Sequence, residues 1–471
     1  MEYNIYCGGR FLKTENKLHV INPYDGEIIG NTWIGDKPIL EKAINAAQHI
    51  ETELANFPAY KKYEALMFIA DGLKSNKNNF AELLCLESAK PIKYAIGEIE
   101  RAIQCFIVAA EESKRLPAEY ISLDWTKPGK GKEGLVNYFP VGLVAGISPF
   151  NFPMNLAVHK IAPAIAAGCP IILKPSSSTP LSTLKLAELI DQTGLPKGAV
   201  SVIPMDRKTG TLLVTDDRIK LLSFTGSPEV GWEMKKQAGK KKIVLELGGN
   251  AGVIVTESAD IEYAAKRCLV GGFAYSGQVC IHAQRMYVAA SVFDDFARRF
   301  ISMVKSLKSG NPLNEDIDIS GLIDEENAIR IEQWVNDAVK QGATILTGGK
   351  REGSFYPPTV LSNTHKDMNV CSKEVFGPVV TLEPFNGFEQ ALDFVNDSRF
   401  GLQAGVFTNV ITEMDKAFKN LYVGGVIIND VPTFRVDHMP YGGIKDSGLG
   451  REGIKYAMYD MLEPKILVKD R

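Results

Sequence analysis

The 471-residue sequence lacks several features that mark large classes of proteins. Its formal net charge is only −3, so it lacks the basic excess of most nucleic-acid-binding chains. Residues 1–18 hold no apolar stretch behind a basic cluster and do not resemble a signal peptide. The longest uncharged run, residues 134–159, contains Pro140, Pro149 and Pro153, which disfavour a membrane-spanning helix. We therefore expect neither a nucleic-acid nor a membrane partner.

Cysteine and histidine are also scarce. The seven cysteines are spread over the chain and form no C-x-x-C pair, so no disulfide framework is expected. The six histidines include no H-x-x-x-H pair, so no structural zinc site is expected either. An odd number of scattered thiols is typical of a reducing compartment, which predicts a cytoplasmic protein.

Hydrophobic periodicity predicts two kinds of structure along the chain. Residues 40–116 place apolar side chains at spacings of three and four, which indicates helices. From residue 141 onward, β-branched runs alternate with helical segments such as 181–192. The runs are 141–147, 170–173, 200–203, 220–224 and 243–247. This alternation predicts a doubly wound parallel sheet, and a second set from about residue 252 past residue 408 predicts a second α/β domain.

Two segments do not fit this alternation. A polar turn over residues 127–132 separates two short β-like runs within 120–139, which indicates an exposed hairpin. The tail, residues 462–468, resembles a strand that has no local partner.

Two short motifs carry candidate reactive side chains. Cys280 follows a Gly277-Gln278-Val279 loop, and a thiol there is either a small buried hydrophobe or a nucleophile. Glu246 lies in an apolar run that ends at Gly248-Gly249. Its carboxyl either faces solvent or is desolvated, with the raised pKa of a general base.

Two further motifs can bind a ligand. Prolines and aromatics hold Asn151 in the segment Pro149–Pro153, so its amide is either an oxyanion donor or a helix cap. Residues 223–231 join a strand to a helix, and such a turn either receives a phosphate or is simply capped. This turn lacks the G-x-G-x-x-G fingerprint of dinucleotide-binding folds.

Together these motifs resemble the aldehyde dehydrogenase superfamily over nearly the whole chain. The resemblance also covers Lys174-Pro175-Ser176, the segment Glu374–Pro378, and Pro440–Lys445 with Ser447–Glu452. It implies a non-acylating, NAD(P)-dependent enzyme with two doubly wound α/β domains and a small β oligomerisation element. The implied limits are 1–119 and 141–247 for the NAD(P)-binding domain, 248–440 for the catalytic domain, 120–140 and 456–471 for the oligomerisation element, and 441–455 for a return segment. A homodimer or homotetramer is implied.

The resemblance also assigns roles. Cys280 becomes the nucleophile, Asn151 and the Cys280 amide the oxyanion donors, and Glu246 the base that activates water; Lys160 completes the catalytic set. Glu246 favours a free acid product, because coenzyme A-acylating members typically lack this acid. The cofactor residues implied are Ile147, Phe150, Lys174, Ser177, Gly226, Ser227, Leu247, Glu374 and Phe376.

Two of these positions depart from the common pattern. Phe150 stands where many members have tryptophan. Ser177 stands where NAD-preferring members often carry glutamate, which binds the ribose 2′-hydroxyl and repels a 2′-phosphate. With serine there and Lys174 supplying a positive charge, we expect NADP to be accepted or preferred beside NAD.

The substrate is less constrained. Candidate contacts are His159, Phe152, His282, Phe434 and Arg435. Arg435 either binds an anionic tail or pairs with Asp437 at the surface. The chain is most similar to lactaldehyde-type members, and we expect a short hydroxyaldehyde, with or without an acidic end. Succinate semialdehyde, sulfolactaldehyde and glyceraldehyde 3-phosphate stay open as substrates, and a catalytically silent nucleotide-binding protein is the rival class.

Overall fold

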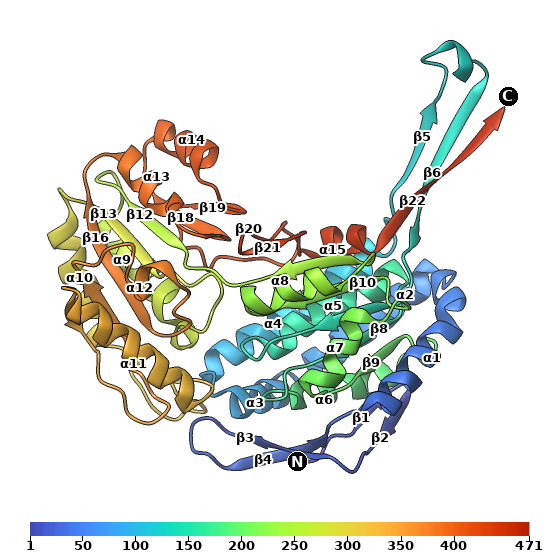
Figure 1. Cartoon of the computed structure of the whole chain (residues 1–471), viewed down its shortest axis with the longest axis horizontal. Helices are drawn as coiled ribbons and strands as arrows, with labels where there is room; N and C mark the ends of the chain where they lie inside the picture. The colour runs from blue at the N-terminus through green and yellow to red at the C-terminus, as the bar shows by residue number, and fades with distance from the viewer. Residues whose placement is uncertain (471) are drawn as a thin grey trace.

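The computed structural model describes residues 1–470, which form two α/β bodies and a projecting β arm (Figure 1). The first body is built on an eight-stranded sheet with the order β2-β1-β9-β8-β7-β10-β11-β21. Strands β9, β8, β7, β10 and β11 pair in parallel, as the alternation predicts. In this order, the strands span Arg10–Leu12, Ile5–Cys7, Val200–Val202, Ile171–Lys174, Val144–Ile147, Leu221–Thr225, Lys242–Glu246 and Gly448–Leu449.

Helices cover both faces of this sheet. Ile171 and Leu173 of β8 pack into the core formed with α2–α6 and α15, whereas Ile172 packs into the core formed with α1 and α7. Such burial on both faces explains why the strands are apolar throughout. The helices are α1 (Lys37–Ala55), α2 (Ala59–Ser75), α3 (Lys77–Ser88), α4 (Ile92–Glu112), α5 (Pro153–Ala167), α6 (Leu181–Asp191), α7 (Arg207–Thr215), α8 (Pro228–Gln237) and α15 (Ile454–Asp460).

The second body repeats this plan with a seven-stranded sheet of order β14-β15-β16-β13-β12-β18-β19. Val253 and Val255 of β12 pack against α9 and α10, while Ile254 packs toward α13 and α14. The strands are β14 (Thr344–Thr347), β15 (Thr359–Ser362), β16 (Val379–Phe385), β13 (Arg285–Ala289), β12 (Gly252–Val255), β18 (Gln403–Phe407) and β19 (Gly425–Ile428). The helices are α9 (Ile261–Phe273), α10 (Phe293–Lys305), α11 (Glu325–Lys340), α12 (Asn369–Ser372), α13 (Phe388–Asn396) and α14 (Ile411–Asn420). The predicted α/β class with two doubly wound sheets is confirmed.

The arm is a three-stranded antiparallel sheet with the order β22-β6-β5, and it extends away from both bodies (Figure 1). The tail strand β22 (Leu462–Asp470) pairs along its whole length with β6 (Lys132–Pro140), and β5 (Ala118–Ser122) pairs with the other edge of β6. A short 3₁₀ turn, η1 (Lys127–Gly129), lies at the tip. The tail strand thus finds its partner in the predicted hairpin.

Smaller elements complete the fold. Strands β3 (Lys17–Ile21) and β4 (Ile28–Trp33) form one ribbon, and β17 (Phe400–Gly401) pairs with β20 (Ile444–Lys445). A 3₁₀ turn, η2 (Ala274–Gly277), follows α9. Among residues 1–470, no helix combines the length and the apolar character needed to cross a membrane.

Candidate active site

A cavity of about 570 Å³ is lined by residues of both α/β bodies. The segments that follow β10 and β11 contribute Thr225–Glu229 and Glu246–Gly248, so the cavity lies at the carboxyl ends of these parallel strands. This edge is where doubly wound sheets bind ligands. The second body contributes Cys280, Glu374 and Phe376. The volume is that of a site for a small molecule or cofactor.

Cys280 reaches this cavity on a strained loop that follows α9. Tyr275 and Ser276 have φ values of 50° and 52°, a left-handed conformation that non-glycine residues rarely adopt. The strain is held by side-chain hydrogen bonds, because the Tyr275 hydroxyl donates to Ser88 O at 3.3 Å and the Ser276 hydroxyl to Ser320 O at 2.8 Å. Backbone strain that is fixed in this way is typical of functional sites.

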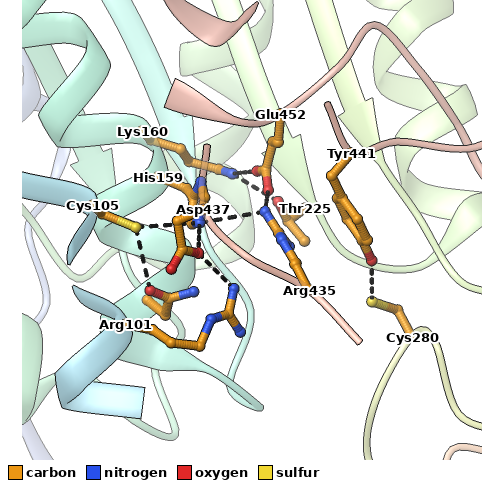
Figure 2. Close-up of polar contacts among 11 residues, drawn as sticks. Arg101, Cys105, His159, Lys160, Thr225, Cys280, Arg435, Asp437, Tyr441 and Glu452 are labelled. Atoms are coloured by element: carbon orange, nitrogen blue, oxygen red, sulfur yellow. Dashed lines mark hydrogen bonds and ion pairs between the residues drawn. The ribbon is translucent and has the colours of Figure 1, made fainter. Parts of the chain in front are cut away.

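The Cys280 thiol is the partly exposed end of this loop. Burial of its surroundings raises the pKa of the thiol to about 11, and a hydrogen bond with Tyr441 opposes that rise. The two atoms of this bond, Cys280 Sγ and the Tyr441 hydroxyl oxygen, are 3.1 Å apart (Figure 2).

Glu246 ends β11 on another wall of the cavity. Both of its carboxylate oxygens are buried and have no hydrogen-bond partner among residues 1–470. Burial, and next the nearby Glu452 carboxylate, raise the pKa of Glu246 well above its ordinary value. Desolvation without a hydrogen-bond partner makes a carboxylate a stronger base.

Asn151 lies between β7 and α5 and also lines the cavity. Its side-chain Nδ2 donates to the backbone carbonyl of Gln278, two residues before Cys280, at 2.9 Å. This bond ties the amide to the cysteine loop. The start of α5 is fixed by Glu98, whose Oε1 accepts from the backbone N–H groups of Met154 and Asn155 at 3.0 Å each.

A chain of buried charges lies to one side of Tyr441 and Cys280 (Figure 2). Lys160 Nζ donates to Thr225 Oγ1 at 2.7 Å and to Glu452 Oε1 at 3.2 Å. Glu452 Oε2 in turn accepts from Arg435 Nη2 at 2.8 Å. Burial raises the pKa of Glu452, but the Lys160 and Arg435 cations outweigh burial and hold it low. Glu452 is therefore the ionised member of the pair it forms with Glu246.

Comparison with known proteins identifies this arrangement. A family model described as "Aldehyde dehydrogenase family" matches residues 11–467. The chain belongs to the aldehyde dehydrogenase family. Its membership confirms the predicted class of enzyme, an NAD(P)-dependent aldehyde dehydrogenase, and the predicted fold.

Two relatives match this family member over almost its whole length. It is 41% identical to a 3-sulfolactaldehyde dehydrogenase of Priestia aryabhattai over 99% of this chain and 98% of the relative. It is 41% identical to a lactaldehyde dehydrogenase of Methanococcus aeolicus over 98% of this chain and 99% of the relative.

Two solved structures agree with the fold of this aldehyde dehydrogenase. Aldehyde dehydrogenase 21 of Physcomitrella patens, solved with the reaction product succinate, has a TM-score of 0.98 at 44% identity, covering 100% of this chain and 98% of that one. A glyceraldehyde-3-phosphate dehydrogenase of Methanocaldococcus jannaschii, solved with NADP, has a TM-score of 0.93 at 39% identity, covering 96% of this chain and 99% of that one.

The residues predicted to bind the cofactor fall into two groups in this dehydrogenase. Six of the nine line the cavity: Phe150, Gly226, Ser227, Leu247, Glu374 and Phe376. The other three, Ile147, Lys174 and Ser177, are not among its lining residues; Ile147 and Lys174 end the neighbouring strands β7 and β8.

The cavity walls fit a nicotinamide dinucleotide. Ser227 caps α8 without a side-chain hydrogen bond, which leaves backbone N–H groups at the helix start for a phosphate. Gly248 lets the chain pass close to Glu374, because a Cβ at Gly248 would lie 2.2 Å from a Glu374 carboxylate oxygen. Burial raises the pKa of Glu374 to about 7. The Phe150 and Phe376 rings meet edge to face, with centroids 5.8 Å apart.

The five residues predicted to contact substrate are not brought together in one place. His159 and Arg435 meet, with 3.3 Å between His159 Nε2 and Arg435 Nη2. Phe152 packs edge to face on Tyr275. His282 instead lies in the interior of the second body and bonds Gly272 O through Nε2 at 2.8 Å; burial lowers the pKa of His282 to about 4. Phe434 is 43% exposed.

Arg435 does not pair with Asp437 at the surface, which was one of the two settings considered from the sequence. It is buried, with 6% of its side chain exposed, and it pairs with Glu452 rather than with Asp437. Asp437 instead accepts from Arg101 Nη2 at 2.7 Å and contacts His159 Nε2 at 2.9 Å. A charge 17 residues further along the chain, that of Glu452, decides the direction of the guanidinium.

Cys105 is the cysteine nearest this buried network, and it lies 3.4 Å from His159 Nε2. Cys105, His159 and Asp437 place their ligand atoms within 4.8 Å of one another. Arg101 and Arg435 already supply positive charge to this group, so its electrostatics do not favour a metal cation. Cys105 is fully buried and does not line the cavity, whereas Cys280 does.

Sequence reasoning missed two residues of the site. Glu452 and Tyr441 both lie in motifs that carried the family resemblance, yet neither had a role assigned. Their backbones pair with each other, through N–H···O bonds of 2.9 and 2.6 Å. One feature of the sequence could have indicated them: an acidic and an aromatic residue lie in glycine-rich turns, and binding and catalytic residues are often found on such loops.

Proposed function

We propose that this aldehyde dehydrogenase oxidises a short hydroxyaldehyde that carries an anionic tail to the corresponding free carboxylic acid. The observation that carries the proposal is that Cys280, Glu246 and Asn151 line one cavity, together with the residues expected to hold NAD(P). The named relatives that act on sulfolactaldehyde and lactaldehyde support the hydroxyaldehyde.

Cys280 acts as the nucleophile in this proposal. Its thiolate attacks the aldehyde carbon, the carbonyl oxygen becomes an oxyanion, and a thiohemiacetal forms. The oxyanion accepts hydrogen bonds from the Cys280 backbone N–H and from Asn151 Nδ2. One of the two Nδ2 hydrogens is used by Gln278 O, which fixes the amide and leaves the other hydrogen for the substrate.

NAD(P), held by cavity residues such as Ser227, Glu374 and Phe376, would supply the hydride acceptor, and loss of a hydride from the thiohemiacetal carbon would leave a thioester on Cys280. Glu246 then takes a proton from water, which attacks the thioester, releases the acid and frees the thiol. The carboxyl suits this role because it is desolvated and has no hydrogen bond to break. Lys160 and Glu452 stay charged in this scheme: Lys160 donates to Glu452, and the Glu452 carboxylate helps to keep the pKa of Glu246 raised.

The nine predicted cofactor residues keep their proposed role, and NADP is proposed as a coenzyme beside NAD. Ser177 presents no carboxylate to a 2′-phosphate, and Lys174 supplies a cation at the end of the adjoining strand. The similar enzyme from Methanocaldococcus jannaschii, which was solved with NADP, supports this proposal.

For the anionic tail we propose Arg435, with His159 beside it. Arg435 Nε is buried and has no hydrogen-bond partner among residues 1–470, so the guanidinium retains a free donor. Phe152, Phe434 and His282 keep a proposed substrate role; His282 has the least support, because its ring bonds Gly272 O.

A substrate panel tests the proposal. Lactaldehyde, glyceraldehyde, glyceraldehyde 3-phosphate, sulfolactaldehyde and succinic semialdehyde are each assayed with NAD and NADP, with and without coenzyme A. We expect coenzyme reduction without coenzyme A and the highest kcat/KM on an anionic hydroxyaldehyde. Arg435→Ala should raise KM about tenfold for the charged members only, whereas any loss of kcat should be shared by charged and neutral members, because the Arg435 cation also faces Cys280.

Other outcomes of this panel have definite meanings. An equal rise in KM across charged and neutral members would exclude Arg435 as the anion contact. A requirement for coenzyme A would indicate an acylating enzyme, and coenzyme binding without aldehyde-dependent reduction would indicate a silent nucleotide-binding protein.

We further propose the predicted division of the chain. Residues 1–119 and 141–247, with the return segment 441–455, bind NAD(P); residues 248–440 form the catalytic domain; residues 120–140 and 456–471 associate copies of the chain into a homodimer or homotetramer. The cytoplasm is proposed as the compartment, supported by seven cysteines that are all free.

A further inference from the structure

Tyr441 is held rigidly against the cysteine. Its ring is buried, with 3% of the residue exposed, and its backbone N–H and carbonyl both pair with Glu452. The Arg435 guanidinium lies over the face of the ring, 3.7 Å from its centroid. A ring fixed by its backbone on one side and by a cation on its face has little freedom to move its hydroxyl away from Cys280 Sγ, which is 3.1 Å distant.

Several charged groups face the thiol from different elements. Glu374 and Glu246 favour the neutral thiol by repelling a negative charge, and burial acts in the same direction. The Arg435 cation favours the thiolate, and Tyr441 does so through its hydrogen bond. Arg435 and Tyr441 are therefore the two groups that stabilise the thiolate against burial and against the two carboxyls.

The phenol remains the donor when the thiol ionises. Burial, and then the charge of Cys280, raise the pKa of Tyr441 well above its ordinary value, so the phenol keeps its proton while the thiol loses one. An O–H donor to an anion forms a stronger hydrogen bond than a donor to a neutral group. The Arg435 cation draws electron density from the ring and strengthens that donor further.

We propose that Tyr441 is a further catalytic residue, whose hydroxyl donates a hydrogen bond to the Cys280 thiolate and so increases the fraction of enzyme ready to attack the aldehyde. This inference rests on the proposed role of Cys280. It adds to that role the group that stabilises the reacting sulfur before any substrate is present.

The test is the pH dependence of Cys280 alkylation in wild type and in Tyr441→Phe, without aldehyde or coenzyme. Iodoacetamide forms an S–C bond with the thiolate and releases iodide, and mass spectrometry of the Cys280 peptide measures the rate. Tyr441→Phe keeps the ring and its contact with Arg435 and removes only the hydroxyl. We expect the midpoint pH to rise by about one unit, so that alkylation below the midpoint slows about tenfold.

A matched control removes a similar hydrogen bond elsewhere. Tyr6 is also buried, and its hydroxyl donates to Asp191 Oδ1 at 3.1 Å. Tyr6→Phe should leave the midpoint of Cys280 alkylation unchanged. An unchanged midpoint in Tyr441→Phe would overturn the inference, and so would a slowing of equal size at every pH, because access rather than ionisation would then have changed.

A second measurement separates this inference from the proposed function. Cys280→Ser should abolish the burst of reduced coenzyme with aldehyde; a surviving burst would refute Cys280 as the nucleophile even if Tyr441→Phe shifts the alkylation midpoint. Conversely, loss of the burst in Cys280→Ser with no midpoint shift in Tyr441→Phe would leave the nucleophile in place and refute the role of Tyr441.

Discussion

Glu246 is buried and yet forms no hydrogen bond with residues 1–470, a combination that folded proteins rarely tolerate for a carboxyl group. We expect Glu246→Gln to keep a burst of reduced coenzyme and to lower the steady-state rate by about 10²–10⁴-fold, the usual contribution of a general base. The amide fills the same space but cannot take a proton from water. Rapid-mixing kinetics with the preferred aldehyde separate the two phases, and an unaltered steady-state rate would remove Glu246 from this role.

The same carboxyl links stability to pH. Burial raises its folded-state pKa, so folding favours the protonated form, and its contribution to stability falls as pH rises above the ordinary value of 4.5. Glu246→Gln removes this ionisation. We therefore expect its melting temperature to exceed that of wild type by about 2 °C at alkaline pH, with a difference that shrinks toward pH 4.5. Thermal melts across pH check this, and a constant difference would contradict it.

Asn151 offers a complementary test of the acylation half of the reaction. We expect Asn151→Ala to slow the burst phase itself by about 10²–10³-fold, because one oxyanion donor is lost. The Gln278 carbonyl also loses its partner, so the position of the cysteine loop needs a check. Alkylation of Cys280 at the wild-type rate would show that the loop is intact, while an unchanged burst would exclude the amide as a donor.

At the scale of elements, the start of α5 depends on an ion pair that is buried between helices. Lys90 precedes α4 and Glu98 lies within it; both side chains are fully buried and pair with each other. Glu98 also caps α5, and the Lys90 ammonium lies 3.9 Å from the centre of the Phe152 ring. One pair thus connects α4 to the segment that carries Asn151.

Removing one partner of this pair should cost much more than removing both. Glu98→Gln leaves the Lys90 cation buried and uncompensated, and we expect the free energy of unfolding to fall by about 3–5 kcal/mol. The double variant Lys90→Met, Glu98→Gln removes both charges and should recover part of that loss. Denaturant unfolding of wild type and both variants measures the difference, and a double variant less stable than Glu98→Gln would contradict the expectation.

The sequence predicts elements of this kind well and their buried charges poorly. The apolar period of residues 40–116 predicts helices where α1–α4 lie, and the β-branched runs fall within three residues of β7–β11. Periodicity treats a charged residue as exposed, however, and Glu98 is buried, where it pairs with Lys90 and caps α5. The partner of Arg435 and the hydroxyl beside Cys280 likewise come from residues 452 and 441, contacts that no local pattern encodes.

At the scale of the whole molecule, the arm is a sheet without a core of its own. The arm leaves apolar side chains exposed: Trp125 (87%) in the connection between β5 and β6, and Ile466 (48%), Leu467 (52%) and Val468 (49%) on β22. A three-stranded sheet needs one covered face for stability, and apolar exposure of this extent marks an interaction surface. The tail strand follows from its β-branched residues, but its pairing with β6 is a tertiary contact across some 320 residues of chain.

We expect this arm to hold copies of the chain together, and charges placed on β22 should separate them. Ile466 and Val468 lie on the same side of the strand, because alternate residues share a face, so Ile466→Lys with Val468→Lys puts two cations on one face. Light scattering coupled to gel filtration should show a dimer or tetramer for wild type and a monomer for this variant. Tyr60→Lys, which charges an equally exposed aromatic residue of α2, should leave the oligomer intact.

Cys280, Glu246 and Asn151 all come from one chain, so the monomer should still give a burst of reduced coenzyme. A monomeric wild type, or an intact oligomer in the double variant, would contradict an associating role for the arm.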